Sequence, residues 1–132
     1  MKKNTTITNV VAGLLGLLFL VFGLNFFLQF MPVPPPPEGS PAAAFLGSLY
    51  SSGYLAFVKV LEIAGGIALA IPFLRRLGLL LLGPIIVNIL AFGVFFTNGA
   101  SLVTPPVLVI ILTTLYLLWA ERGAFITFLK SN

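Results

Sequence analysis

The sequence predicts an all-α membrane protein, a bundle of four transmembrane helices in one domain over residues 1–132. Of these residues 59% are hydrophobic and 8% are charged, and the mean hydropathy is +1.15. Soluble domains carry about 25% charged residues, so a surface this apolar is expected to face lipid. Four apolar runs, each near the ~20 residues that cross a bilayer, provide the helices.

The first predicted span covers residues of about 8–30 and follows the basic pair Lys2 and Lys3. A secretory signal also begins with basic residues, but its apolar core spans only roughly 7–15 residues. This run is longer and has the length of a helix that crosses a bilayer. We therefore expect the segment to be retained as a span.

Residues 31–53 are predicted to form a Pro-rich loop and a short helix. The run Pro34–Pro37 is incompatible with a helix interior and favours extended polyproline II structure. Ser40 is a typical N-cap, Pro41 suits the first helical position, and Gly53 is a natural end. We expect this helix on the extracytoplasmic side, either lying on the lipid interface or covering the bundle.

The second, third and fourth spans are predicted at about 54–73, 77–96 and 104–121. The pair Arg75 and Arg76 is predicted to form a tight basic turn between the second and third spans. A short uncharged turn separates the third and fourth spans, and prolines suit the start of the last helix.

Basic residues predict the orientation of these spans. Six of the seven Lys and Arg residues lie in the N-terminal segment, in the turn between the second and third spans, or in the C-terminal tail. The positive-inside rule places such segments in the cytoplasm. Both termini are therefore expected to be cytoplasmic, and the scattered basic residues indicate topology rather than nucleic-acid binding.

The composition also excludes several kinds of chemistry. The chain has no Cys and no His, which excludes the usual zinc, copper, iron–sulfur and bis-His haem sites as well as thiol nucleophiles and Ser/His/Asp triads. Three carboxylates, Glu38, Glu62 and Glu121, lie in different segments and cannot build a metal cage. We expect no metal, no haem and no catalytic activity from the chain alone.

Five polar side chains lie where a span should be apolar: Asn25, Gln29, Lys59, Glu62 and Asn88. With a rise of ~1.5 Å per residue, all five fall in the outer half of a ~30 Å apolar core. A charge in a span costs about 2.5–3.5 kcal/mol, so Lys59 and Glu62 are expected to pair at i, i+3, with the amides assisting, or to be neutral by proton transfer. This polar cluster is the predicted ligand-binding site. The competing interpretation is that it only holds the helices in register.

Small and hydroxylated residues predict close packing elsewhere. Gly16 and Gly23 lie on one face of the first span, roughly opposite its two amides, and can seat another helix. Thr113, Thr114 and Tyr116 in the fourth span are expected to satisfy backbone carbonyls or to line the bundle.

Three segments resemble the DoxX family in order and spacing. They are Gly16-Leu-Leu-Phe-Leu-Val-Phe-Gly-Leu-Asn25, Lys59-Val-Leu-Glu-Ile-Ala-Gly-Gly66 and Gly83-Pro-Ile-Ile-Val-Asn88. The resemblance covers the first three spans, while the fourth matches only as a hydrophobic segment. It implies a multi-pass protein of the bacterial inner membrane, related to membrane subunits of a thiosulfate:quinone oxidoreductase.

The resemblance implies a non-catalytic or quinone-binding subunit of a respiratory or redox membrane complex. Its expected partners are membrane lipids and other membrane subunits or further copies of the chain, with no nucleic acid. Because the chain lacks Cys, any redox role needs a bound quinone or a partner that carries the cofactor. The alternative is a purely structural accessory subunit. A small transporter is a third interpretation, less favoured because no inverted repeat is visible.

Overall fold

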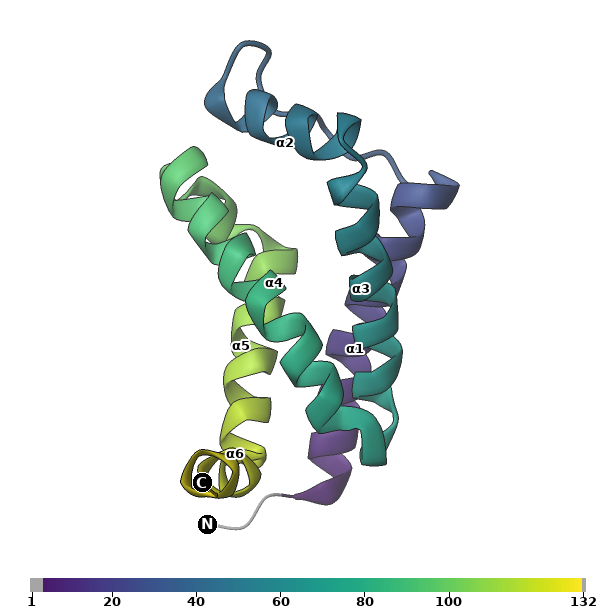
Figure 1. The fold of residues 1–132 in the computed structure, drawn as a ribbon, viewed down its shortest axis with the longest axis vertical. Coiled ribbons are helices and arrows are strands. Elements are labelled where there is room, and N and C mark those ends of the chain that lie inside the picture. The colour runs from purple at the N-terminus through teal and green to yellow at the C-terminus, as the bar shows by residue number, and fades with distance from the viewer. Residues whose placement is uncertain (1–3, 132) are drawn as a thin grey trace.

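The computed structural model describes residues 4–131, and this range is helical with no strand (Figure 1). The all-α class predicted from the sequence is confirmed. The helices are α1 (Thr5–Leu28), α2 (Pro41–Ser51), α3 (Tyr54–Ala70), α4 (Arg75–Phe96), α5 (Pro105–Ala120) and α6 (Arg122–Lys130), with the short 3-10 helices η1 (Pro72–Leu74) and η2 (Ala100–Val103). Four of them, α1, α3, α4 and α5, run along the molecule, while α2 and α6 lie across its two ends.

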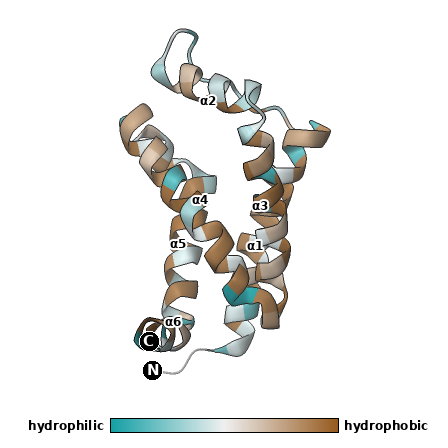
Figure 2. Cartoon of the chain, viewed as in Figure 1, coloured by the Kyte–Doolittle hydropathy of each residue, from teal (hydrophilic) through white to brown (hydrophobic). Residues whose placement is uncertain are grey.

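Two helical segments are long and apolar enough to cross a membrane, Thr5–Leu28 and Pro72–Phe96. The number rises to four if α2 with α3, and α5 with α6, each form one bent span, with bends of 82° and 62°. Hydrophobic residues dominate the four long helices α1, α3, α4 and α5 along their length (Figure 2). The fold is thus compatible with a membrane protein, while the four-span topology and the cytoplasmic termini stay predictions.

One turn differs from its predicted position. α3 ends at Ala70 rather than near residue 73, because Ile71 is extended (φ −94°, ψ 117°) in front of Pro72, as residues before proline usually are. The turn is therefore Ile71–Leu74, and the basic pair predicted as a turn lies in the first turn of α4. The predicted C-terminal tail contains a further helix, α6.

The short helix after the Pro-rich loop is present as α2. Ser40 Oγ accepts a hydrogen bond from the Ala43 amide at 3.2 Å, and Pro41 occupies the first helical position. Gly53 follows the helix with φ 83°, a left-handed conformation that glycine adopts without strain. Local chemistry therefore accounts for both ends of this helix.

Glycines bring α3 against two neighbours at once. A Cβ added to Gly66 would lie 2.6 Å from the Gly16 carbonyl oxygen of α1, and one added to Gly65 would lie 2.6 Å from the Leu82 side chain of α4. A Cβ on Gly23 would lie 2.7 Å from Ile63. The prediction that Gly16 and Gly23 seat another helix is confirmed, and that helix is α3.

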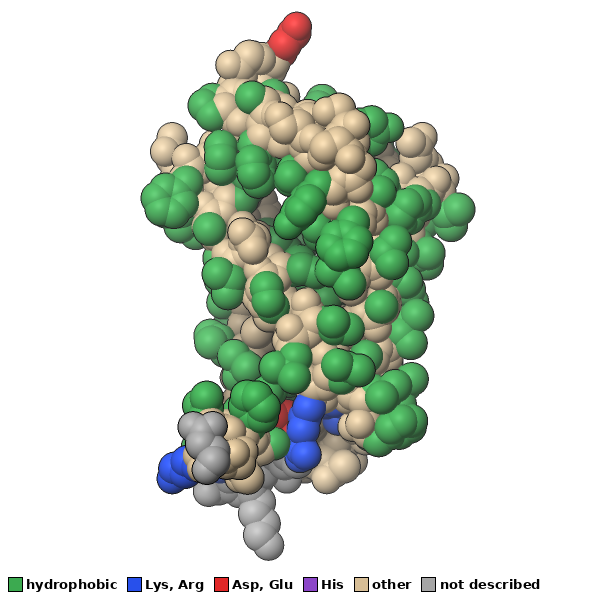
Figure 3. All heavy atoms as spheres, in the orientation of Figure 1, with side chains coloured by type: hydrophobic (Ala, Val, Ile, Leu, Met, Phe, Trp, Pro, Cys, Tyr) green, Lys and Arg blue, Asp and Glu red, His purple; other side chains and the backbone are tan. Residues whose placement is uncertain are grey.

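The apolar core joins four helices. Its buried members are Ala12, Leu15, Phe19, Leu69, Leu79, Leu82, Ile86, Ile110 and Leu117. The outer surface is apolar as well, and hydrophobic side chains cover most of the face seen in Figure 3. Such a surface suits lipid or protein neighbours rather than water.

Candidate functional site

Lys59 and Glu62 form an ion pair on α3. The Lys59 Nζ lies 3.4 Å from Oε1 and 3.4 Å from Oε2 of Glu62. Residues three apart share a helix face, which is why one helix brings the two groups together. The Glu62 side chain is 7% exposed and that of Lys59 is 22% exposed. The direct pairing predicted from the i, i+3 spacing is confirmed.

The ion pair leaves most of its hydrogen-bonding capacity unused. A tight charge-assisted bond between nitrogen and oxygen measures about 2.7–2.9 Å, and both distances here are longer. An ammonium has three donors and a carboxylate about four acceptor positions. Between residues 4 and 131, the side chains of Lys59 and Glu62 have no hydrogen-bond partner besides each other. A ligand that reaches the pair can therefore hydrogen-bond to the Lys59 ammonium or the Glu62 carboxylate without disrupting the backbone of α3.

The Asn25 side chain is hydrogen-bonded to the backbone that follows α1 and not to the ion pair. Its Oδ1 accepts a hydrogen bond from the Met31 amide at 2.7 Å, and its Nδ2 donates to the Met31 carbonyl at 3.1 Å. Gln29 ends α1 with φ 52°, and its side chain is exposed. Neither amide is hydrogen-bonded to the ion pair. This local bond was not predicted from the sequence, although the backbone that leaves α1 before the prolines needs hydrogen-bond partners.

Asn88 is also hydrogen-bonded within its own helix. Its Nδ2 donates to the Pro84 carbonyl at 2.8 Å, one turn earlier in α4, and the residue is exposed. The five predicted residues therefore form one ion pair and three amides without a hydrogen bond to it.

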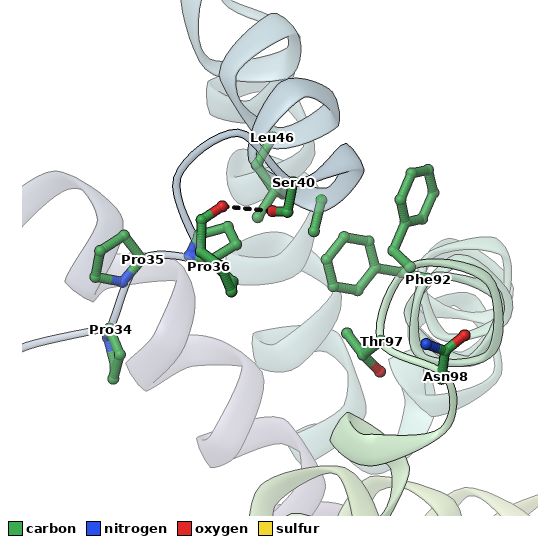
Figure 4. Close-up of a pocket in the computed structure, with 11 residues that line it drawn as sticks. Pro34, Pro35, Pro36, Ser40, Leu46, Phe92, Thr97 and Asn98 are labelled. Atoms are coloured by element: carbon green, nitrogen blue, oxygen red, sulfur yellow. Dashed lines mark hydrogen bonds between the residues drawn. The ribbon is translucent and has the colours of Figure 1, made fainter.

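A cavity of about 470 Å³ lies between the Pro-rich loop, the start of α2 and the end of α4 (Figure 4). Its walls are the prolines of the loop and the rings of Phe92 and Phe96, and Ser40, Thr97 and Asn98 are its polar residues. The Ser40 hydroxyl donates to the Pro37 carbonyl at 2.6 Å. None of the five predicted site residues lines this cavity, although its volume is in the range of ligand pockets.

Aromatic rings hold α2 over the end of α4. Phe45 stacks on Phe96 with ring centroids 5.0 Å apart and lies 6.0 Å from Phe92. On the other side Tyr50 lies 5.9 Å from Phe26 of α1. Of the two roles left open for this helix, these contacts favour a cover over the bundle.

A second ion pair lies at the end of the molecule opposite α2. Arg76 Nε donates to Glu121 Oε2 at 2.9 Å, and the Glu121 side chain is 5% exposed. Arg75 is buried as well, and its Nε donates to the Leu69 carbonyl at 3.1 Å. The sequence indicated only a topology role for Arg75 and Arg76 and no partner for Glu121. The signal available was that Glu121 is the one carboxylate on the side of the predicted spans where the basic residues gather.

Hydroxyl groups make further polar contacts on α1 and α5. Thr8 and Tyr116 are joined through their oxygens at 3.0 Å, linking α1 to α5. Thr113 Oγ1 donates to the Val109 carbonyl at 2.6 Å, as predicted, whereas Thr114 Oγ1 is buried and has no hydrogen-bond partner among residues 4–131.

Over residues 4–131, the fold and the site define a small helical protein with two to four candidate apolar spans and a largely buried ion pair within α3. Within the described range, no three His, Cys, Asp or Glu side chains lie together as a metal site would require. No protein-family model, curated protein or solved structure matched the chain.

Proposed function

We propose that this chain is a multi-pass membrane protein of the DoxX type that binds a quinone or a similar small ligand and has no catalytic activity on its own. The observation that carries the proposal is the Lys59–Glu62 pair, which is largely buried and still has free donors and acceptors. Ionisable groups within an apolar span are costly and usually mark functional sites. The protein would serve a respiratory or redox complex of the bacterial inner membrane, with both termini in the cytoplasm.

The chemistry of a quinone suits this ion pair. Its carbonyl oxygen can accept a hydrogen bond from the Lys59 ammonium, and the hydroxyl of its reduced form can donate to the Glu62 carboxylate. Lys59, the more exposed of the two, offers the approach. Because the chain has no Cys and no His, electrons would have to come from a partner subunit.

Binding of a short-chain quinone to the protein in lipid nanodiscs tests this proposal. Glu62→Gln and Lys59→Met should each weaken binding about tenfold or more, since a hydrogen bond to a charged group contributes about 1.5–3 kcal/mol. Asn88→Ala is the matched control and should bind like the wild type, because this amide bonds only to its own helix. If both charge variants bind the quinone normally and only their melting temperatures change, the ion pair is structural.

A structural accessory subunit is the second candidate function, and the exposed amide of Asn88 favours it. Its Nδ2 donates to Pro84, but its Oδ1 has no partner in the described part of the chain. Exposed amides in membrane spans hydrogen-bond across helices, so α4 would dock on another membrane subunit. Asn88→Leu should then reduce assembly of the complex in native mass spectrometry and leave quinone binding intact. Recovery of the wild type as a lone monomer would count against this role.

A further inference from the structure

We propose that α6 and the basic residues beside it form a binding surface for the headgroups of anionic phospholipids. This basic end consists of the exposed residues Arg76, Arg122 and Lys130 and the buried Glu121. It lies at the opposite end of the molecule from α2 and does not involve the Lys59–Glu62 pair, so its test is independent of the proposed function.

The direction of α6 is the first argument. The chain bends by 62° at Glu121, so α6 lies across the end of the bundle and is seen end-on in Figure 1. A helix in this position lies in the plane of a membrane surface if the long helices cross the membrane. Interfacial helices are oriented in this way.

The two faces of α6 suit such a position. At 100° per residue, Phe125, Ile126 and Leu129 lie on one face, while Thr127 lies on the other and Lys130 lies between them. Leu129 is 73% exposed and Ile126 is 48% exposed, whereas Phe125 is partly buried against the apolar core. The exposed side chains of Ile126 and Leu129 can therefore enter the acyl region, and Lys130 can extend towards the phosphates.

The charge at this end is strongly one-sided. Among the described residues at this end, the three exposed basic side chains Arg76, Arg122 and Lys130 stand with one carboxylate, that of Glu121, which accepts a hydrogen bond from Arg76 Nε at 2.9 Å. Figure 3 shows Lys and Arg side chains near this end of the molecule, whereas an acidic side chain projects at the opposite end. A basic residue close to an anionic leaflet contributes about 1 kcal/mol of attraction. An anionic lipid surface is thus the complementary partner.

Trp119 and Arg122 place the surface at the membrane interface. The Arg122 guanidinium lies 4.4 Å from the centroid of the Trp119 ring, and its Nη1 donates to the Trp119 carbonyl at 2.7 Å. Tryptophan is enriched at the level of the lipid headgroups, where its ring is apolar and its N–H is polar. An arginine held on that ring is at the height of the phosphates, which guanidinium groups bind well.

Trp119 is also the only tryptophan of the chain, which makes it a reporter for the lipids around α6. The full chain is reconstituted in vesicles with equal amounts of a phosphoglycerol lipid and a phosphocholine lipid, and the acyl chains of one lipid at a time are brominated to quench the tryptophan. The anionic lipid should show an apparent affinity about two- to fivefold higher near Trp119. This preference should fall towards one in high salt, since salt screens exposed charges. Equal quenching by the two lipids at low salt would overturn the proposal.

A pair of variants at one position separates charge from structure. Lys130→Gln should lower the preference for the anionic lipid, whereas Lys130→Arg should keep it. Arg122 is left in place because its loss would change the fluorescence of Trp119 directly. The same preference in both variants would contradict a role for Lys130. If Lys130→Gln fails to fold, the lipid preference and salt dependence of the wild type still decide the question.

Discussion

The backbone of Gly16 in α1 lies directly against the backbone of Gly66 in α3. A Cβ built on Gly66 would lie 2.6 Å from the Gly16 carbonyl oxygen, and a Cβ built on Gly16 would meet the Gly66 carbonyl in turn. Real atoms do not approach so closely, so any larger side chain must push the two helices apart. Small residues at such contacts are the usual means of close packing between membrane helices.

Gly16→Ala should therefore destabilise the protein by about 1–3 kcal/mol, the usual cost of an overpacked core. Gly13→Ala is the matched control on the same helix, because nothing lies within 4 Å of its added Cβ. It should leave stability unchanged or raise it by up to about 1 kcal/mol, since alanine favours a helix. Thermal unfolding in one detergent checks both variants, and equal melting temperatures would contradict the Gly16–Gly66 contact.

Asn25→Ala should loosen the chain directly after α1. The substitution removes both hydrogen bonds to the Met31 backbone, for a cost of about 1–3 kcal/mol. Hydrogen exchange of the Met31 amide should become faster, while exchange in the middle of α1 stays slow. Asn88→Ala, which loses only a bond within its own helix, should leave Met31 protected. Unchanged exchange at Met31 in Asn25→Ala would show that the two bonds do not hold this turn.

Phe45→Ala should release α2 from the end of α4. Phe45 stacks on Phe96 at 5.0 Å, and aromatic pairs contribute about 0.5–1.5 kcal/mol beyond the area that they bury. Amides of residues 42–51 should exchange faster with solvent in this variant. Phe73→Ala serves as the control, because this ring is 85% exposed and lies after the C-terminal end of α3, away from α2. Normal protection of α2 in Phe45→Ala would mean that other contacts hold it.

The Arg76–Glu121 bond should couple the start of α4 to the end of α5. A double-mutant cycle with Arg76→Gln and Glu121→Gln should give a coupling free energy of about 0.5–1.5 kcal/mol, limited because Arg76 is 63% exposed. Arg76→Gln combined with Glu38→Gln provides the comparison, since Glu38 lies at the far end of the molecule and the two effects should add. A coupling near zero in the first cycle would contradict the bond.

Much of the secondary structure followed from the sequence because its causes are local. The apolar runs have the length of spans, and Pro34–Pro37 cannot enter a helix. Ser40 and Pro41 suit a helix start, so α2 was predicted close to its observed position. The bond between Lys59 and Glu62 was predictable for the same reason, because residues three apart in one helix lie on the same face.

What the sequence determined by itself was the class of the fold, the apolar segments and the polar pair within α3. Only the tertiary structure decided which groups meet across helices. The Asn25 side chain is hydrogen-bonded to the Met31 backbone, and the Asn88 side chain is hydrogen-bonded within its own helix. Arg75 is buried at the start of α4. Helical periodicity gives the relative positions of residues on one helix, but it leaves open how far each helix is rotated and shifted against its neighbours. Side-chain packing makes that choice, and here the decisive contacts are backbone against backbone at the glycines of α1, α3 and α4.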